Sequence, residues 1–294
     1  MARHEISGPT TAPPYSYAEK VDLSGHMLHL TPRVLPGQRV VAAGLHAAAL
    51  PSRISEGADH IGNAARWLFL DRPHDRFQVT LEAEIDVAFP APPPAGAIPP
   101  WEQVAEAAGR GGLPAWRDAE FAFASPMAPA DPAAGAYAAA SFPPGRPVLA
   151  GLLELTRRIN QDFALKPGET TLHTPVSQVL TSRAGVCQDF TRLMIAGLRA
   201  LGLPARYVSG YLRTTPPPGG AALRGADLSH AWVGGWMGPE AGWVDLDPTN
   251  NLIVHTDHVV LAWGRDYGDI SPIRGVILGG GAHSVEVVVD LVPI

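Results

Sequence analysis

Prolines occupy four of the five positions from Pro90 to Pro94, and this cluster limits how the chain can fold. Proline lacks the backbone N–H that helices and strands use, so neither element continues through the cluster. Before it, Phe77–Val87 alternates between apolar and polar side chains, which is the period of a strand with one buried face. We therefore expect residues 1–95 to form an N-terminal β domain. Shorter strand-like runs precede the alternating segment at Met27–Leu30, Val40–Leu50 and Arg66–Leu70.

Residues 96–147 differ from both flanking segments because they are rich in alanine, proline and glycine. Two short helices are predicted within them, at Trp101–Ala108 and Asp131–Ala140. The low complexity of this segment indicates no chemistry of its own, so we interpret it as a connector.

The third segment, residues 148–294, begins with helices and continues with strands. Apolar residues recur at helical spacing over Val148–Phe163 and again over Val186–Leu201, where Gly202 and Pro204 end the helix. Helices followed by strands, without regular alternation, predict an α+β fold rather than a doubly wound sheet. The strand-like runs are Ala205–Leu212, Ser229–Met237, Trp243–Asp247, Val259–Trp263 and Val285–Leu291.

The charge balance and the single cysteine exclude several classes of protein. Lysine and arginine number 22 against 28 aspartates and glutamates, a net charge of −6, which argues against a dedicated nucleic-acid binder. One cysteine permits no intramolecular disulfide and no multi-cysteine metal site. Met1–Pro14 has no apolar core of the kind a signal peptide needs, and no later stretch reaches the ~18 apolar residues of a membrane span. We therefore expect a cytoplasmic protein without membrane contact.

The cysteine lies where a nucleophile is expected. Cys187 follows Gly185 and falls in the first turn of the helix predicted over Val186–Leu201. A thiol there faces the positive end of the helix dipole and free backbone N–H groups, which favour the thiolate and can hold an oxyanion. The alternative is that an isolated cysteine is a small buried hydrophobic residue. A nucleophile also requires a base.

His230 is the histidine best placed to act as that base. It lies near the start of the run 229–237, which is followed after a glycine- and proline-containing break by the run 243–247. A hairpin that turns on Gly238–Pro239 puts His230 opposite Asp247, on the same face, with Cβ atoms about 4.5–5.5 Å apart. Asp247 can then orient the imidazole and stabilise its charged form.

One alternative partner for His230 stays open, and one alternative chemistry is disfavoured. Asp245 has the same parity as Asp247 and replaces it if the register slips by two residues. His255 and His258 resemble a metal-binding pair, but they lie on no predicted helix and no further ligand cluster lies beside them, so we expect no metal.

Four ordered motifs together resemble the core of the bacterial transglutaminase-like family. They are Arg183–Phe190 with the cysteine, Ala205–Leu212, Ser229–Val233 with the histidine, and Gly242–Asn251 with the aspartate. The resemblance continues downstream through Gly264–Tyr267 and Asp269–Pro272, and more weakly upstream at Leu28–Arg33, Gln38 and Asp59–Asn63. It implies a papain-like α+β core, in which a helix bearing the cysteine packs on a sheet, preceded by a β domain.

Carried over residue by residue, the family pattern makes Cys187 the nucleophile, His230 the base and Asp247 the residue that orients the base. Two departures concern the cleft rather than this triad. Leu165 stands where the family more often has tyrosine, and Gly234–Trp236 replaces the usual acidic and aliphatic residues.

Further candidates for the cleft remain undecided. Gln178 and Gln188 are both candidates for the side chain that binds an oxyanion. Four tryptophans are candidates for an acyl-donor groove, although core packing explains them more simply: Trp232, Trp236, Trp243 and Trp263.

These residues predict a cysteine-dependent amide or peptide hydrolase, of protease or amidase type, that acts through a thioester. The thiolate attacks an amide carbonyl, and the imidazole protonates the leaving amine. Water then hydrolyses the thioester unless an acceptor site binds an amine and excludes water. An acyl transferase that joins glutamine carboxamides to amines is the first alternative, and a non-catalytic binding protein of the same fold is the second. We expect a peptide or protein substrate and no cofactor.

Overall fold

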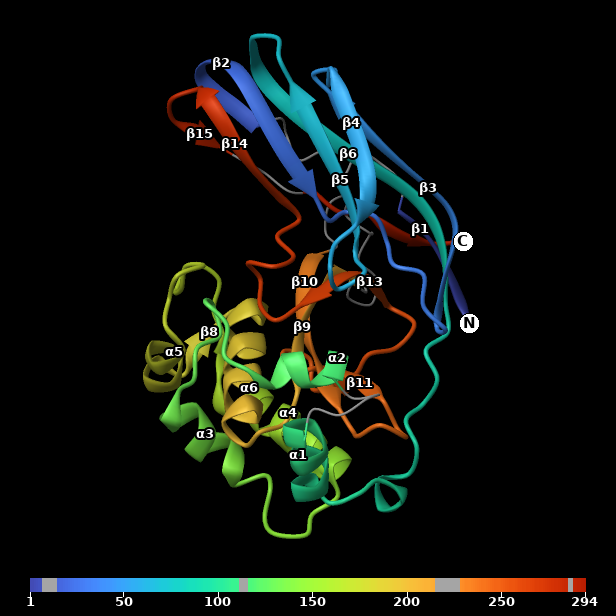
Figure 1. The fold of residues 1–294 in the computed structure, drawn as a ribbon, viewed down its shortest axis with the longest axis vertical. Helices are drawn as coiled ribbons and strands as arrows, with labels where there is room; N and C mark the ends of the chain where they lie inside the picture. The colour runs from blue at the N-terminus through green and yellow to red at the C-terminus, as the bar shows by residue number, and fades with distance from the viewer. Residues whose placement is uncertain (7–14, 111–115, 215–227, 285–287) are drawn as a thin grey trace, which may run out of the picture.

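The computed structural model describes residues 1–6, 15–110, 116–214, 228–284 and 288–294. Within these residues, nine strands form a larger sheet, five form a smaller sheet, and the helices gather beside the smaller one (Figure 1). The strands of the N-terminal region are β1 Ala2–Ile6, β2 Tyr15–Leu28, β3 Gln38–Ala48, β4 Arg53–Ala58, β5 Ala64–Leu70 and β6 His74–Val87. None of the helices in these ranges is long and apolar enough to cross a membrane.

The elements after the proline cluster begin with helices and end with strands. The helices are α1 Trp101–Arg110, α2 Trp116–Ala119, α3 Pro132–Ala139, α4 Val148–Asp162, α5 Val176–Ser182 and α6 Cys187–Ala200, with short 3₁₀ turns at Ala95–Ala97 and Glu120–Ala122. The strands are β7 Ala164–Leu165, β8 Ala184–Gly185, β9 Ala205–Leu212, β10 Leu228–Trp236, β11 Trp243–Asp247, β12 Leu252–Ile253, β13 His258–Gly264, β14 Ile273–Gly279, β15 His283–Ser284 and β16 Leu291–Pro293. The α+β fold predicted from the sequence is confirmed.

The larger sheet is antiparallel and is organised around β6. This strand pairs with β1, β2 and β3, and the main strand order is β16-β1-β6-β2-β5-β4. Alternate residues of β6 from Phe77 to Ile85 are buried, in the period-two pattern that the sequence predicts. The strongly alternating segment therefore supplies the central buried face of the N-terminal region.

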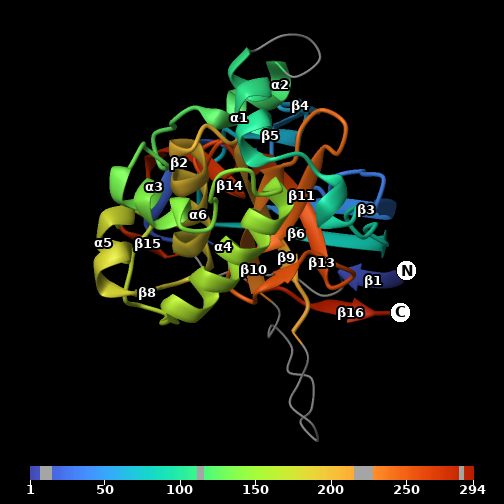
Figure 2. The same cartoon turned by 90° about the horizontal axis from the view of Figure 1, so that it is seen from below.

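The C-terminal strands return to the N-terminal sheet. β14 and β15 pair with β2, and β16 pairs with β1, so that the two chain ends lie side by side (Figures 1 and 2). The segment predicted as one domain over residues 148–294 thus contributes strands to both sheets. Of the strand-like run Val285–Leu291, residues 285–287 lie outside the described residues.

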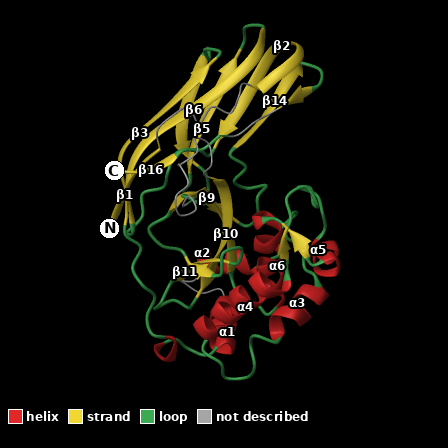
Figure 3. Cartoon of the chain, turned by 180° about the vertical axis from the view of Figure 1, so that it is seen from behind, coloured by secondary structure: helices red, strands yellow, loops and turns green. Residues whose placement is uncertain are grey.

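The smaller sheet carries the helices on one face. Its strand order is β12-β11-β10-β9-β13, with antiparallel neighbours throughout. Helices α4 and α6 pack against it (Figure 3) through a core that includes Leu152, Phe190, Leu193 and Val233. The two long helices predicted from apolar spacing are confirmed, with ends within one residue of the predicted ones.

Two side-chain amides from the N-terminal region bind the outer strand of the smaller sheet, β13. Gln38 donates from Nε2 to the Val260 carbonyl at 2.8 Å and accepts from the Val260 N–H at 2.7 Å. Asn63 donates to the Trp263 carbonyl at 2.8 Å and accepts from its N–H at 2.9 Å. Each amide binds the backbone N–H and carbonyl that a further strand would otherwise pair with. The backbone groups at the edge of β13 are therefore hydrogen-bonded, and the N-terminal region is held against the smaller sheet.

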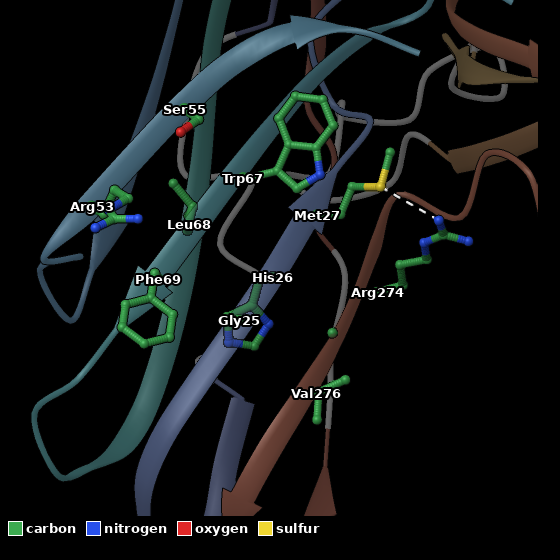
Figure 4. A pocket seen from close by; sticks show the side chains of 11 residues that line it. Gly25, His26, Met27, Arg53, Ser55, Trp67, Leu68, Phe69, Arg274 and Val276 are labelled. Atoms are coloured by element: carbon green, nitrogen blue, oxygen red, sulfur yellow. Dashed lines mark hydrogen bonds between the residues drawn. The ribbon is translucent and has the colours of Figure 1, made fainter. Parts of the chain in front are cut away.

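The larger sheet also carries an apolar hollow of about 460 Å³ (Figure 4). An added Cβ on Gly25 would meet no atom within 4 Å, so this glycine leaves the hollow open. Trp67, Phe69 and Val276 line it, together with Arg274, whose Nη2 lies 3.5 Å from the Met27 sulfur. The predicted catalytic residues do not line this hollow.

Candidate active site

The start of α6 places Cys187 at a cavity. Cys187 is the first residue of the helix and is partly buried. Backbone N–H groups in the first turn of a helix have no partner within the helix, and the helix dipole adds positive potential at the same place. The predicted position of the cysteine, in the first turn of a helix, is confirmed.

Asp189 and Gly185 fix the first turn of α6. Asp189 Oδ2 accepts hydrogen bonds from the Val186 N–H at 2.9 Å and from the Thr170 hydroxyl at 2.5 Å. A Cβ on Gly185 would lie 2.9 Å from both the Cβ and the Oδ2 of Asp189, so glycine is needed for this close approach. Sequence reasoning missed Asp189, although an acidic residue three positions after a helix cap is a recognised signal.

His230 and Asp247 are in direct contact inside the protein. His230 Nε2 lies 2.8 Å from Asp247 Oδ2, and the two residues are only 5% and 0% exposed. A charged group at such depth is stable only when it is paired and hydrogen-bonded. The contact therefore joins two groups that each depend on the other for their charged state.

This contact arises from a different strand register than the one the sequence predicts. The hairpin closes between Met237 and Gly242 instead of on Gly238–Pro239, so the pairing of β10 with β11 is shifted by two residues. The predicted register is wrong, and His230 reaches Asp247 diagonally rather than from directly opposite. A shift by two preserves the face on which a side chain lies, which is why the contact survives.

Among the residues that the structure describes, five hydrogen-bond donors hold Asp247. Its Oδ1 accepts from the backbone N–H groups of Thr249 at 2.9 Å and Asn250 at 3.1 Å. Its Oδ2 accepts from the Asn250 amide at 2.7 Å, from His230, and from His258 Nε2 at 3.3 Å. Burial opposes ionisation, but the hydrogen bonds and the charge of His230 outweigh it and hold the pKa of Asp247 well below its ordinary value.

The imidazole of His230 binds the Asp247 carboxylate and shares a cavity with the Cys187 thiol. Burial alone lowers the pKa of His230, but hydrogen bonds to Asp247 and Cys187, and the charges of both partners, raise it to about 10. Since Nε2 binds Asp247, Nδ1 is the ring nitrogen left for the thiol. The site thus favours the charged form of His230.

Asp245, the alternative partner for His230, is engaged elsewhere. Its Oδ1 lies 3.2 Å from Arg206 Nη2, and its Oδ2 accepts from Trp232 Nε1 at 3.3 Å. The guanidinium of Arg206 is itself stacked between the rings of Trp243 and Trp263, at 4.5 and 3.8 Å from their centroids. The geometry therefore favours Asp247 over Asp245.

Cys187 and His230 line a cavity of about 280 Å³. The N-terminal region also supplies part of its lining, through Tyr15, Leu30 and Val79, together with Ile273 at the start of β14. Gln188 lines the cavity next to Cys187, whereas Gln178 lies exposed on α5 and is not among the lining residues. Of the two oxyanion candidates, the geometry thus favours Gln188.

The four tryptophans considered for a groove do not line this cavity. Trp232 and Trp236 are fully buried in the core, which agrees with the simpler explanation. Trp243 and Trp263 line a separate cavity of about 1000 Å³, together with Arg206. Core packing, the explanation that the sequence favoured, thus holds for Trp232 and Trp236, and none of the four tryptophans is among the residues that line the cavity at Cys187.

The two glycines among the departures from the family pattern have local packing reasons. A Cβ on Gly234 would lie 2.5 Å from Arg206 Nε, and a Cβ on Gly235 would lie 3.0 Å from the Leu152 side chain. Leu165 is exposed in the short strand β7, which pairs with β8 just before the cysteine.

His258 joins the site although sequence reasoning did not place it there. From the sequence, His258 is a candidate only as a partner of His255 in a metal site, which is not expected. In the structure, His258 contacts Asp247. One nitrogen of His230, one nitrogen of His258 and one carboxylate oxygen of Asp247 lie within 4.8 Å of one another. No local signal could reveal this contact, because β13 reaches the site by pairing with β9.

Comparisons with known proteins agree with this architecture. Residues 144–248 match the transglutaminase-like superfamily, and residues 13–86 match the bacterial transglutaminase-like N-terminal region. An uncharacterized protein of Mycobacterium tuberculosis is 41% identical over 289 residues, which are 95% of this chain and 90% of that protein. The protein-glutamine gamma-glutamyltransferase of Pseudomonas aeruginosa is 36% identical over 99 residues, which are 32% of this chain and 15% of that protein.

A solved structure shares the whole fold. A candidate cysteine protease from Cytophaga hutchinsonii superposes with a TM-score of 0.71 and 21% sequence identity, covering 99% of this chain and 89% of that one. Together with the two matched regions and the close relative, this establishes that the chain belongs to the transglutaminase-like superfamily.

Proposed function

We propose that this protein is a cysteine-dependent amide or peptide hydrolase, with Cys187 as nucleophile, His230 as general acid and base, and Asp247 as the residue that orients the imidazole. One observation carries the proposal. His230 is bound by Asp247 at 2.8 Å, and His230 and Cys187, which begins α6, line the same cavity. Such an arrangement of nucleophile, base and orienting acid is the minimum that thiol acyl chemistry requires.

The first half of the reaction forms a thioester. The Cys187 thiolate adds to the amide carbonyl carbon, and the carbonyl oxygen takes up the negative charge. Backbone N–H groups of the first helical turn, with the Gln188 side chain beside them, stabilise that oxyanion. As the C–N bond breaks, the His230 imidazolium transfers its proton to the departing amine, which leaves as a neutral molecule.

The second half returns the enzyme to its starting state. His230, now neutral, takes a proton from water, and the resulting hydroxide attacks the thioester carbonyl. Collapse of this intermediate releases a carboxylic acid and the Cys187 thiolate, while His230 keeps the proton. Hydrolysis is preferred over transfer because water is abundant, and transfer needs a site that binds an amine and excludes water.

The N-terminal region contributes to substrate binding in this proposal. Tyr15, Leu30 and Val79 line the same cavity as Cys187, so this region shapes the cleft while the smaller sheet and α6 supply the reacting groups. The substrate is a peptide or protein that carries an accessible amide. A reducing, cytoplasmic location suits a single free thiol of this kind.

The test is incubation with a peptide library, with and without an added primary amine, read by mass spectrometry. Hydrolysis predicts cleaved peptides or deamidated glutamines, absent with the Cys187→Ala variant. Amine adducts as the main product would instead favour acyl transfer, a reaction suggested by the similarity to the Pseudomonas aeruginosa gamma-glutamyltransferase. Equal product formation by the Cys187→Ala variant, or none by the wild type, would contradict the proposed catalytic role.

A further inference from the structure

His258 is a fully buried histidine that the mechanism above does not use. It is 0% exposed, it begins β13, and its Nε2 lies 3.3 Å from the Asp247 Oδ2 that also binds His230. Its ring packs edge-on against the Trp232 ring at 5.2 Å between centroids. A buried polar ring is costly to keep unless it has a defined task or partner.

From this geometry we propose that His258 is a positioning residue, a second imidazole that holds the Asp247 carboxylate in place for His230. The inference deepens the proposed function and rests on it. The side-chain partner of His258 is Asp247 Oδ2, the oxygen that also binds His230, and His258 therefore acts through Asp247. One carboxylate is thus shared by two imidazoles with different tasks.

The surroundings of His258 fix its protonation state and its tautomer. Its Nδ1 is buried without a hydrogen-bond partner in the described structure, so a proton there would be an unsatisfied buried donor. The proton must therefore lie on Nε2, where it is donated to Asp247, and the ring is neutral. In this tautomer Nε2–H donates to the Asp247 carboxylate, and only the lone pair of Nδ1 has no hydrogen-bond partner.

The titratable groups that face His258 support the same assignment. Burial lowers the pKa of His258, the hydrogen bond and charge of Asp247 oppose this, and the electrostatic effects of the neighbouring imidazoles of His230 and His255 add to the lowering, which prevails. Asp257, the residue before His258, lies 3.7 Å from His255 Nδ1 and accepts a hydrogen bond from Arg213 at 2.7 Å. The neighbouring imidazole of His230 shifts in the opposite direction, so the two rings are separated into a charged one and a neutral one.

The neighbouring strands are built to hold the ring at this point. His258 pairs with Leu212 across β9, and Val260 pairs with Gly210 on the same strand. A Cβ on Gly210 would lie 2.4 Å from the Trp232 ring, so glycine is required for this tryptophan to lie over β9. Trp232 in turn packs against His258, which leaves the imidazole little freedom to turn away from Asp247.

The experiment compares three substitutions at His258 by the pH profile of Cys187 alkylation with iodoacetamide. His258→Leu fills the space but removes the donor, His258→Phe also keeps a ring against Trp232, and His258→Gln restores an N–H donor of similar reach. His255→Gln is the matched control, because His255 touches the ring of His258 and does not bind Asp247. The folded state of each variant is checked by circular dichroism.

We expect labelling of the Leu and Phe variants at pH 5.5 to slow by about 10–100-fold, the usual effect of losing a hydrogen bond to a charged group. Their profiles should move toward that of a free thiol, with kcat reduced and KM unchanged on any substrate that the library identifies. The Gln variant and the His255 control should resemble wild type. If Leu fails to fold, the Phe variant is read by the same criterion.

Each outcome bears on one claim. A wild-type Cys187 that labels only after denaturation would defeat the proposed function itself. A wild-type Cys187 that labels at pH 5.5, with a folded Leu or Phe variant that behaves identically, would overturn the role of His258 and leave the proposed function standing. If the His258→Gln variant does not restore the wild-type pH profile of labelling, the role of His258 is also overturned, because the hydrogen bond to Asp247 would then not explain the slower labelling.

Discussion

Replacing Asp247 by asparagine separates catalysis from packing. Asparagine keeps the size of the side chain but removes the charge that Oδ2 presents to His230 at 2.8 Å. The new amide N–H₂ group would also face the side chains of His258 and Asn250, which bind Asp247 Oδ2 in the wild type. If the amide nitrogen takes the place of Oδ2, His230 loses its hydrogen-bond acceptor. The variant should still fold, because the backbone N–H groups of Thr249 and Asn250 keep an acceptor at Oδ1.

The expected effect follows from the protonation of His230. Its pKa is about 10, compared with 6.5 for an ordinary histidine, and each pKa unit is a factor of ten in the equilibrium. The site thus shifts the protonation equilibrium of His230 toward the imidazolium by a factor of about 10³. Asp247 and Cys187 together account for this factor. Losing the share of Asp247 should slow Cys187 labelling at pH 5.5 by about 10–100-fold. Turnover should fall further, by about 10³–10⁴-fold, because the ring also loses its orientation.

The assay is iodoacetamide labelling followed by intact-protein mass spectrometry, which reports on Cys187 alone because the chain has a single cysteine. Asp245→Asn is the matched control. Labelling of that variant should stay within about threefold of wild type, because Asp245 binds Arg206 and Trp232 rather than His230. Its free energy of unfolding should fall by about 1–3 kcal/mol, because the buried Arg206 loses its partly buried anionic partner. If Asp245→Asn slows labelling and Asp247→Asn does not, the orienting residue is misassigned.

Three further expectations follow from the structure. Gln188→Ala should lower turnover by about tenfold or more while the exposed Gln178→Ala changes it little, and equal kinetics of the two variants would remove Gln188 from the oxyanion site. Gln38→Met should lower the free energy of unfolding by about 2–4 kcal/mol in denaturant titrations, because the Val260 N–H and carbonyl lose their partner; an unchanged midpoint would contradict this. The raised pKa of His230 implies that wild type is more stable than His230→Gln below about pH 6.5 and loses this advantage as pH rises through about 10, so a stability difference that grows with pH would show the opposite sign.

Local periodicity predicts the elements that carry the site. The helix that begins with Cys187 and the strands around His230 and Asp247 follow from apolar spacing and from glycine and proline at their ends. The register of the hairpin did not follow, because Gly238 and Gly242 both have positive φ and support a longer turn than the one expected. His230 and Asp247 nevertheless lie on the same face of the sheet, as predicted, because side chains on a strand alternate with period two and the register is shifted by two residues.

The parts that the sequence could not predict all depend on contacts between distant segments. His258 reaches Asp247 only because β13 pairs with β9. The C-terminal strands add to the N-terminal sheet, although the proline cluster and some 180 residues separate them from it. Gln38 and Asn63 were noted only as parts of a family pattern, and their task, which is to bind the edge of β13, becomes visible once that edge is placed.

The central claim, that Cys187 forms a thioester which His230 then resolves, is tested most directly by trapping the acyl-enzyme. The wild type and the His230→Ala and Cys187→Ala variants are mixed with an activated ester such as p-nitrophenyl acetate, and intact and peptide masses are followed with time. We predict an acetyl group on Cys187 that disappears by hydrolysis in the wild type, persists in any His230→Ala protein that becomes acylated, and is absent from Cys187→Ala. An acetyl group on another residue with the same turnover, or none on the folded wild type, would contradict the mechanism.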